Sequence, residues 1–352
     1  MEKKVEDNQR RFYEIDTLKG IMTFCIVLFH LSGTDLKEAF PNILHIFYRH
    51  GGDYGNTLFF MLSGFMMYYV YFKKVHNIAL SKFLYNRVSK IYLTYFLSSF
   101  VVVLFQIKNS GIQILTYKSV VLNIFLITTG WVEDIYPFNI PCWFLSSLML
   151  QYMIWYIVTK KNKDNCHYIY VGLIFLGLAM EKLSINKPFF YYHTGEAMVP
   201  FFEGCLLCKL WKDKNLYCNK LIKIGWGVLM LFLVLARIMG FDNAAGERKY
   251  VWYFLIVPLV ILTVLEVRAV KNFLRSKIMY FLFGTISTYV FFWHVPCINI
   301  YYMIINGLNI QLTPNMRFVC YIFFLYLFCT VYKYLLCHLQ IKEAIHAKRI
   351  SK

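Results

Sequence analysis

Ten apolar segments, separated by short loops rich in lysine and arginine, run along this chain. Hydrophobic residues make up 59% of its 352 residues and charged residues only 16%, whereas about a quarter of a soluble domain is charged. Because such segments can cross a bilayer as helices, the sequence predicts an all-α fold. We expect a polytopic membrane helix bundle in one domain, residues 1–352, with spans at about 16–340 and short cytoplasmic tails. The ten segments are approximately residues 16–33, 54–72, 91–107, 140–158, 168–180, 196–210, 224–236, 250–265, 279–305 and 318–336.

The distribution of positive charge predicts the orientation of the bundle. The formal net charge is +18, but the basic residues fall in short loops, where a bilayer explains them better than a nucleic acid, and we expect no nucleic-acid binding. With the N-terminus in the cytoplasm, every inside segment carries at least as many basic residues as its outside neighbours. Ten spans with both termini cytoplasmic satisfy this bias. Residues 112–129 are apolar but broken by polar residues, which predicts a re-entrant or interfacial piece.

Lys19 and His30 are the most informative residues of the first apolar segment. Eleven residues amount to about three helical turns, so both lie on nearly one face of a helix, with a rise of roughly 16 Å between them. An ionisable residue inside a membrane indicates a functional site by default. A cation near the membrane surface and an imidazole deeper in the bundle suit an anionic molecule that enters the bundle end-on. The alternative is a packed histidine hydrogen-bonded to a neighbouring helix.

Further ionisable residues lie in or beside later segments. His294 is again deep and precedes Pro296, which interrupts helical hydrogen bonding, and two deep histidines in one bundle strengthen the functional reading. Glu203 is either part of the site or paired with a cation inside the bundle. Arg87 and Lys90 lie at the start of the third segment. They either bind a ligand or anchor the helix at the membrane surface.

Small and sulfur-containing residues have structural readings. Ser63 and Gly64 allow a second helix to approach closely. The ten cysteines are scattered along the chain, and only Cys205 and Cys208 have a spacing typical of a metal or redox site. Because no second pair of ligands lies near them in the sequence, we expect buried free thiols and no metal.

Five stretches follow one another in a characteristic order. They are Asp16-Thr-Leu-Lys19-Gly20 before Val27-Leu-Phe-His30; Leu58-Phe-Phe-Met-Leu-Ser63-Gly64-Phe65; Phe83-Leu-Tyr-Asn-Arg87-Val-Ser-Lys90-Ile-Tyr92; Trp143-Phe-Leu-Ser146-Ser-Leu148; and the run from Ser287 to Pro296. In order, spacing and number of spans they resemble the acyltransferase 3 family of integral-membrane acyltransferases. The resemblance covers nearly the whole chain and implies a multi-pass protein of a bacterial plasma membrane.

The chain departs from the family pattern at three places. Lys19 stands where the family usually has arginine, and the motif around Arg87 is poorer in arginine than is usual. Lysine keeps the charge but loses bidentate phosphate geometry, which bears on donor affinity and pose. Leu148 stands where many members carry a glutamate, and a leucine cannot act as acid or base. Glu203 is a candidate substitute for that glutamate.

The resemblance implies transfer of an acetyl or longer acyl group from acetyl-CoA, a donor substrate rather than a resident cofactor, to a hydroxyl of a cell-surface or extracellular polysaccharide. His30 is expected to act as base or transient acyl acceptor, and His294 to position the hydroxyl or stabilise charge. Lys19, Arg87 and Lys90 are expected to hold the donor phosphates at the cytosolic face. The supporting residues implied for the site are Asp16, Ser63, Gly64, Phe65, Trp143 and Glu203.

Two other function classes remain open from the sequence. A proton-coupled transporter or flippase of a glycan or small molecule would use the deep histidines and Glu203 as a relay, although no internal repeat supports duplicated halves. A membrane scaffold explains the hydrophobicity but not the histidines. Residues 189–193, rich in aromatic side chains, either stack on a sugar ring or form part of an interfacial belt. The oligomeric state stays open.

Overall fold

The computed structural model describes residues 11–132, 134–183, 187–213 and 248–350, together with residues 224, 226–228 and 230–231. Throughout these residues the regular structure is helical, and the bridge of extended backbone found among them joins Lys187 to Phe190. The predicted all-α fold is confirmed.

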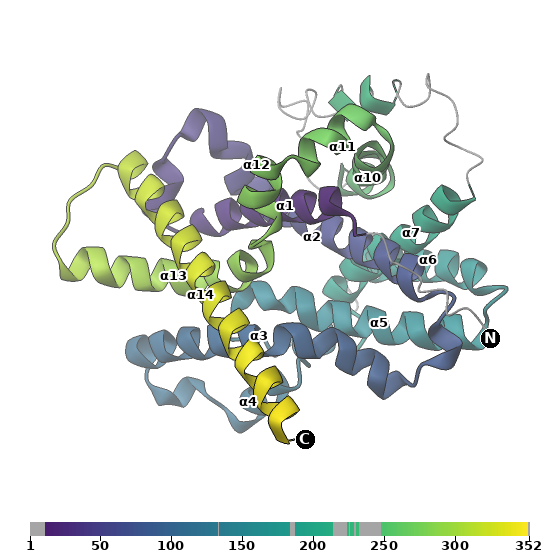
Figure 1. Cartoon of the computed structure of the whole chain (residues 1–352), viewed down its shortest axis with the longest axis horizontal. Helices are drawn as coiled ribbons and strands as arrows, with labels where there is room; N and C mark the ends of the chain where they lie inside the picture. Colours follow the sequence, from purple (N-terminus) through teal and green to yellow (C-terminus); the bar gives the residue numbers. More distant parts are fainter. Residues whose placement is uncertain are drawn as a thin grey trace.

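Figure 1 shows how the helices are arranged. The long ones are α1 (Tyr13–Leu31), α2 (Pro41–Tyr71), α3 (Leu80–Ser110), α5 (Trp143–Lys161), α6 (Cys166–Leu183), α7 (Tyr192–Lys212), α13 (Ser287–Gly307) and α14 (Pro314–Ile350). The shorter ones are α4 (Tyr117–Ile124), α9 (Arg248–Val251), α10 (Val257–Glu266), α11 (Arg268–Arg275) and α12 (Lys277–Met279). Five-residue π-helical turns, η5 (Trp252–Ile256) and η6 (Tyr280–Gly284), precede α10 and α13, and the 3-10 turn η4 (Ile140–Cys142) precedes α5.

Six helices in the described part of the chain are long and apolar enough to cross a membrane. They are Leu80–Ser110, Ile140–Lys161, Cys166–Leu183, Lys249–Glu266, Ser287–Gly307 and Pro314–Leu339. Three other predicted segments, 16–33, 54–72 and 196–210, coincide with α1, α2 and α7, and the segment 224–236 lies mostly outside the described residues. A multi-pass membrane bundle is thus shown, while ten spans and cytoplasmic termini stay predictions. Helix α4 has eight residues, or about 12 Å, too short to span a bilayer.

Helices α2 and α7 cross where each carries a glycine. A Cβ added to Gly64 would lie 1.8 Å from the carbonyl oxygen of Phe201, and one added to Gly204 would lie 2.0 Å from that of Met61. Because no side chain fits at either position, the two glycines permit this close approach of backbones. The reading of Gly64 as a packing residue is confirmed.

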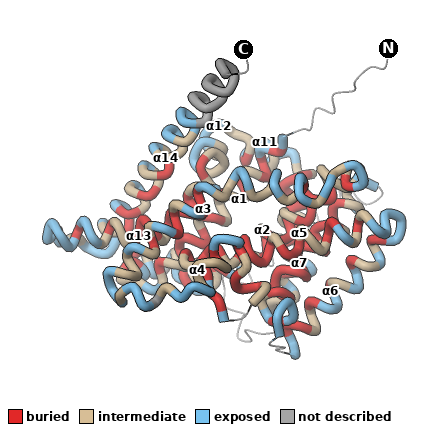
Figure 2. Tube along the Cα trace, turned by 90° about the horizontal axis from the view of Figure 1, so that it is seen from below, coloured by how far each residue is buried: buried red, intermediate tan, exposed pale blue. Residues whose placement is uncertain are grey.

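Buried residues concentrate in the middle of the bundle, and exposed residues lie mainly along the outer helices (Figure 2). Many of the exposed residues are large and apolar. In α14, Phe323 and Tyr334 are more than two-thirds exposed. A soluble protein would bury such residues, but in a bilayer lipid covers them. The exposure pattern therefore agrees with a membrane bundle.

The bundle has two ends, which the course of α1 defines. Phe12, just before α1, packs against Tyr69 near the end of α2 and Trp211 near the end of α7, with ring centroids 5.1 and 6.3 Å away. We call this the Tyr13 end. Helix α1 finishes at the opposite end, where α2 and α7 begin. The charge distribution predicts that the Tyr13 end faces the cytoplasm.

Candidate active site

Two histidines from distant parts of the sequence meet inside the bundle. His30 lies one residue before the end of α1, and His294 lies in the first half of α13. Their ring centroids are 5.1 Å apart, with 42° between the ring planes. His294 is fully buried and His30 is half-buried. The structure brings together the two histidines that the sequence singles out.

The hydrogen bonds of His294 define its neutral tautomer. Its Nδ1 lies 2.8 Å from the carbonyl oxygen of Phe291 and 3.2 Å from that of Val290. A carbonyl can only accept, so in the neutral ring Nδ1 carries the hydrogen and Nε2 carries the lone pair. Nε2 is buried and has no hydrogen-bond partner among the described residues. Leaving such a lone pair unmatched is costly. It can accept a proton, or a hydrogen bond from a hydroxyl group.

Pro296 shapes the helix around His294. Proline has no backbone N–H, so the carbonyl of Phe292, four residues earlier, lacks its helical partner. The side-chain amide of Asn139, just before η4, donates to that carbonyl at 2.9 Å. From α14, the hydroxyl of Tyr321 donates to the carbonyl of His294 at 2.9 Å. Contacts from two other segments therefore hold α13 in place on either side of the histidine.

The ring of His30 is less constrained. It packs edge-on against Phe29, with centroids 5.3 Å apart, and against His294. Among the described residues, neither ring nitrogen of His30 is hydrogen-bonded to a neighbouring helix. The alternative expectation, a packed histidine bonded to another helix, is therefore not what the structure shows.

Lys19 and Arg87 form a pair of like charges nearer the Tyr13 end. The charges of Asp16, on α1, and Arg87, on α3, are both close enough to act on Lys19. The guanidinium carbon of Arg87 lies 4.3 Å from the ring centroid of Tyr71 and 5.7 Å from that of Tyr152. Arg87 Nε is buried without a partner, and no described carboxylate is within ion-pair distance of either cation. Two partly buried cations without a counterion suit an anionic ligand.

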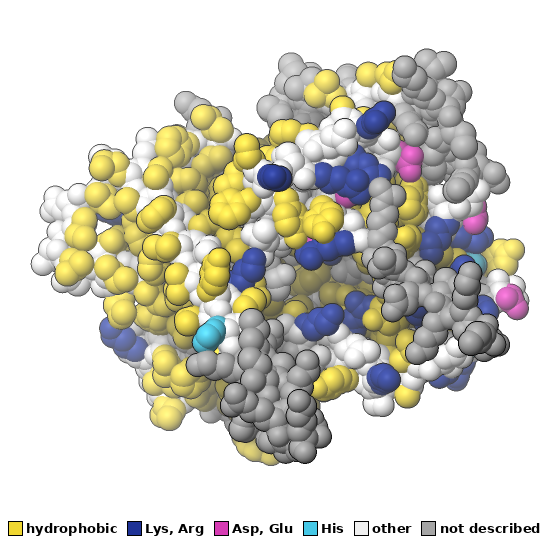
Figure 3. Space-filling model, in the orientation of Figure 1, with side chains coloured by type: hydrophobic (Ala, Val, Ile, Leu, Met, Phe, Trp, Pro, Cys, Tyr) yellow, Lys and Arg dark blue, Asp and Glu magenta, His cyan; other side chains and the backbone are white. Residues whose placement is uncertain are grey.

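Lys90, the third expected anchor, lies three residues beyond Arg87 on α3 and is exposed. It makes no hydrogen bond or ion pair with the described residues. Figure 3 shows lysine and arginine side chains gathered around a hollow between α1 and α3 on this face of the molecule. The structure thus unites Lys19 and Arg87 and leaves Lys90 at the surface.

Three of the expected supporting residues have separate surroundings. Asp16 pairs with Arg11 at 3.0 Å, and this hydrogen bond raises the pKa of the Arg11 guanidinium. Ser63 lies beside the hydroxyl of Tyr152, one of the rings under Arg87. The Oε2 atom of Glu203 is buried without a hydrogen-bond partner, and no described cation lies within ion-pair distance of this carboxylate. The expected pairing of Glu203 with a cation is not found among these residues.

The remaining expected residues pack in the interior. Phe65 is fully buried, with its ring centroid 5.7 Å from that of Trp211. Trp143, at the start of α5, lies against the ring of His193, with centroids 4.8 Å apart. Leu148 is buried in α5, so that position supplies only packing.

The predicted state of the cysteines is confirmed at the pair with the distinctive spacing. Cys205 and Cys208 are buried free thiols on α7. Cys205 contacts the carbonyl oxygen of Gly64 at 3.3 Å, within the α2–α7 crossing. In the described part of the chain, no three His, Cys, Asp or Glu side chains are placed to hold a metal ion.

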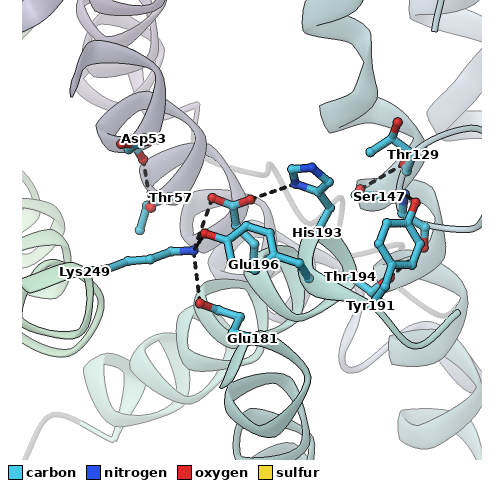
Figure 4. A network of polar contacts seen from close by, with 12 residues as sticks. Asp53, Thr57, Thr129, Ser147, Glu181, Tyr191, His193, Thr194, Glu196 and Lys249 are labelled. Carbon is cyan, nitrogen blue, oxygen red and sulfur yellow. Dashed lines mark hydrogen bonds and ion pairs between the residues drawn. The ribbon is translucent and has the colours of Figure 1, made fainter. Parts of the chain in front are cut away.

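A charged network that the sequence analysis does not foresee lies at the end opposite Tyr13 (Figure 4). Lys249 Nζ, from α9, lies 3.0 Å from Glu181 Oε2 on α6 and 3.3 Å from Glu196 Oε1 on α7. His193 Nδ1 lies 3.0 Å from Glu196 Oε2. The sequence interpretation treats Lys249 as one more loop charge. Glu181 and Glu196 each lie at the end of an apolar segment. These two carboxylates are the sequence signal that could have indicated a buried cation partner.

Comparison with protein families matches residues 12–334, nearly the whole chain, to the acyltransferase 3 family, whose model is described as an acyltransferase domain. The chain belongs to this family. The resemblance recognised from the motifs is confirmed, and the protein is a membrane acyltransferase. Neither the curated proteins nor the solved structures contain a match to the chain.

In this membrane acyltransferase, the histidine pair and the cation pair both lie within the matched region. Lys19 and His30 are separated by roughly 16 Å along α1, which suits a donor whose anionic part and reacting group are joined by a long arm. The side chains that surround the pairs come from α1, α2, α3, α5 and α13.

Proposed function

We propose that this acyltransferase transfers an acetyl group from acetyl-CoA to a hydroxyl of a cell-surface or extracellular polysaccharide, in the plasma membrane of a bacterium. The observation that carries the proposal is the contact of His30 with His294, whose Nε2 lone pair is buried and unmatched. An imidazole is suited to take a proton from a hydroxyl near neutral pH. Family membership supports acyl transfer, and the motif resemblance supports this donor and acceptor.

The donor is assigned to the cation pair. Lys19 and Arg87 have no carboxylate partner among the described residues, so the phosphates of acetyl-CoA supply the missing negative charge. Lys90 adds charge at the surface, where the donor arrives. With the phosphates there, the thioester arm extends along α1 and brings its carbonyl to His30.

The reaction begins when His30 takes the proton of the acceptor hydroxyl as its oxygen attacks the thioester carbonyl. The tetrahedral intermediate then collapses, the C–S bond breaks, and coenzyme A leaves as a thiolate that regains the proton from the imidazolium. His294 Nε2 would accept a hydrogen bond from the N–H of His30. The other ring nitrogen of His30 would then keep its lone pair and could act as the base. A two-step route with His30 as transient acyl acceptor uses the same residues.

The test compares His30→Ala with His45→Ala, a matched change at an exposed histidine of α2. Loss of a positioned base lowers transfer by about 10²- to 10⁴-fold, so His30→Ala should remove one O-acetyl signal from the NMR spectrum of the surface polysaccharide. Expression and membrane insertion should be unchanged, and His45→Ala should retain the signal. An unchanged spectrum for His30→Ala would remove this residue from the mechanism.

Purified protein separates the enzyme from the transporter alternative. The proposal predicts that the intact chain releases coenzyme A from acetyl-CoA and that His30→Ala does not. A transporter would leave the thioester intact in both forms, so absence of release from the folded wild type contradicts acyl transfer.

A further inference from the structure

We propose that the network of Lys249, Glu181 and Glu196 forms the acceptor subsite, and that this subsite takes a neutral or amino sugar in preference to an acidic one. The inference rests on the proposed function and adds the place and the charge class of the acceptor. The network lies at the bundle end opposite Lys19 and Arg87, so the acceptor and the donor anchor occupy different ends.

Unmatched polar atoms beside the network point to a ligand. Glu181 Oε1 and the hydroxyl of Tyr253 are buried and have no hydrogen-bond partner among the described residues. The Tyr253 hydroxyl lies close to Glu196 and to Glu181, with which it makes at most a poorly aligned hydrogen bond. Trp252 Nε1, on the same turn η5, is also buried and unmatched. Buried polar groups without a partner call for an explanation, and a bound ligand supplies one here.

Aromatic rings surround the same network. Lys249 donates to the Tyr192 hydroxyl at 2.9 Å, and Trp143 packs on His193. Trp252 stacks on Tyr54 of α2, with ring centroids 4.1 Å apart. Aromatic faces beside carboxylates and an imidazole suit a sugar ring, because its C–H face stacks while its hydroxyls donate and accept hydrogen bonds.

The balance of charge selects among sugars. Glu181 and Glu196 face one lysine, Lys249. When His193 is neutral, the two carboxylates outnumber this single cation, and the network carries an excess negative charge. The side chains of Glu181 and Glu196 are 3% and 10% exposed, so water screens this excess weakly. A carboxylated sugar would therefore be repelled, whereas a neutral or ammonium-bearing sugar would not.

One segment connects the subsite to the histidine pair. Asn139 binds the carbonyl of Phe292, two residues before His294. Four residues later, Trp143 packs against His193, whose side chain is 35% accessible. A sugar bound at the network would thus lie beside the segment from Asn139 to Trp143, which contacts the helix that carries His294.

Tyr253→Phe tests the subsite, with Tyr117→Phe, at an 86% exposed tyrosine of α4, as the matched control. Membranes supply the cell's own acceptor, and the readout is incorporation of radiolabelled acetyl groups from acetyl-CoA into polysaccharide. Removing one hydrogen bond to the acceptor should lower incorporation roughly tenfold. Because the hydroxyl is unmatched in the free protein, its loss should not lower the melting temperature. Acceptor-free release of coenzyme A by purified protein, which reports on the donor site, should fall far less than incorporation.

Glu181→Gln provides a second variant, with the same expected split between incorporation and acceptor-free release. NMR of the native polysaccharide should place the acetyl group on a neutral or amino sugar. Wild-type incorporation by both variants, equal loss of incorporation and acceptor-free release, or acetylation of a uronic acid would each overturn the subsite alone. A folded wild type that releases no coenzyme A overturns the proposed function, and the subsite with it.

Discussion

Two partly buried cation sites in this acyltransferase differ in how their charge is balanced. Lys249 has two carboxylates within ion-pair distance, whereas Lys19 and Arg87 have none among the described residues and face each other and aromatic rings. Burying a charge is costly unless a partner compensates it. The contrast supports the proposal that an anionic donor compensates the charge of the second site.

The Tyr13 end does not lack carboxylates in general. Glu14, which is fully buried, binds Arg275 at 2.6 Å and lies 3.7 Å from Lys271. Asp16, one turn before Lys19, pairs with Arg11. Both carboxylates are thus in direct ion pairs with other cations, and Asp16 acts on Lys19 only from beyond ion-pair distance.

The largest effect is expected from Lys249→Met, which leaves two carboxylates facing each other in the interior. Removing one partner of a buried ion pair costs about 3–5 kcal/mol, so the midpoint of unfolding in denaturing detergent should fall sharply. Adding Glu181→Gln and Glu196→Gln should recover part of this loss, because the repulsion is then removed. An unchanged midpoint for Lys249→Met would show that the two sites do not differ as described.

Lys19→Met should have the opposite profile. With no direct ion pair to abandon, the variant should be about as stable as the wild type. Its KM for acetyl-CoA should rise by about 10- to 100-fold, the value of one charge-assisted hydrogen bond. Lys19→Arg, which restores the residue usual in the family, should keep or lower the KM because a guanidinium can bind phosphate bidentately. A fall in stability with normal KM would make Lys19 a structural residue.

The smallest effect is expected from salt. Raising the ionic strength from about 50 mM to about 500 mM shortens the screening length and should weaken coenzyme A binding severalfold, as measured by calorimetry. The melting temperature should change little over the same range, because the Lys249 ion pairs are internal. Equal sensitivity of both quantities would indicate that the two sites are equally open to water.

The sequence predicts the helices well because apolar runs report directly on burial in lipid. The segments around His30 and His294 form helices where the pattern places them, and Gly64 packs as its small size suggests. The resemblance to a family also directs attention to both histidines. Their contact itself is not readable from spacing, since 264 positions separate the two residues.

Other parts of the site depend on tertiary contacts that no local pattern encodes. Lys249, Glu181 and Glu196 each look like surface charges beside apolar runs, and only the packing of α6, α7 and α9 buries them together. The role of Asn139 is equally hidden, because its partner is a backbone carbonyl of α13. Lys90 illustrates the reverse case, since it shares a motif with Arg87 but remains at the surface.

Pro296 in α13 determines where the segment around Asn139 attaches to this helix. Pro296 leaves the carbonyl of Phe292 without its helical N–H partner, and the Asn139 amide donates to that carbonyl instead. Any other residue at position 296 would supply an N–H to the same carbonyl and compete with the asparagine for it. The loop before α5 would then be held less firmly against the histidine helix, although no side chain of the proposed reaction had been altered.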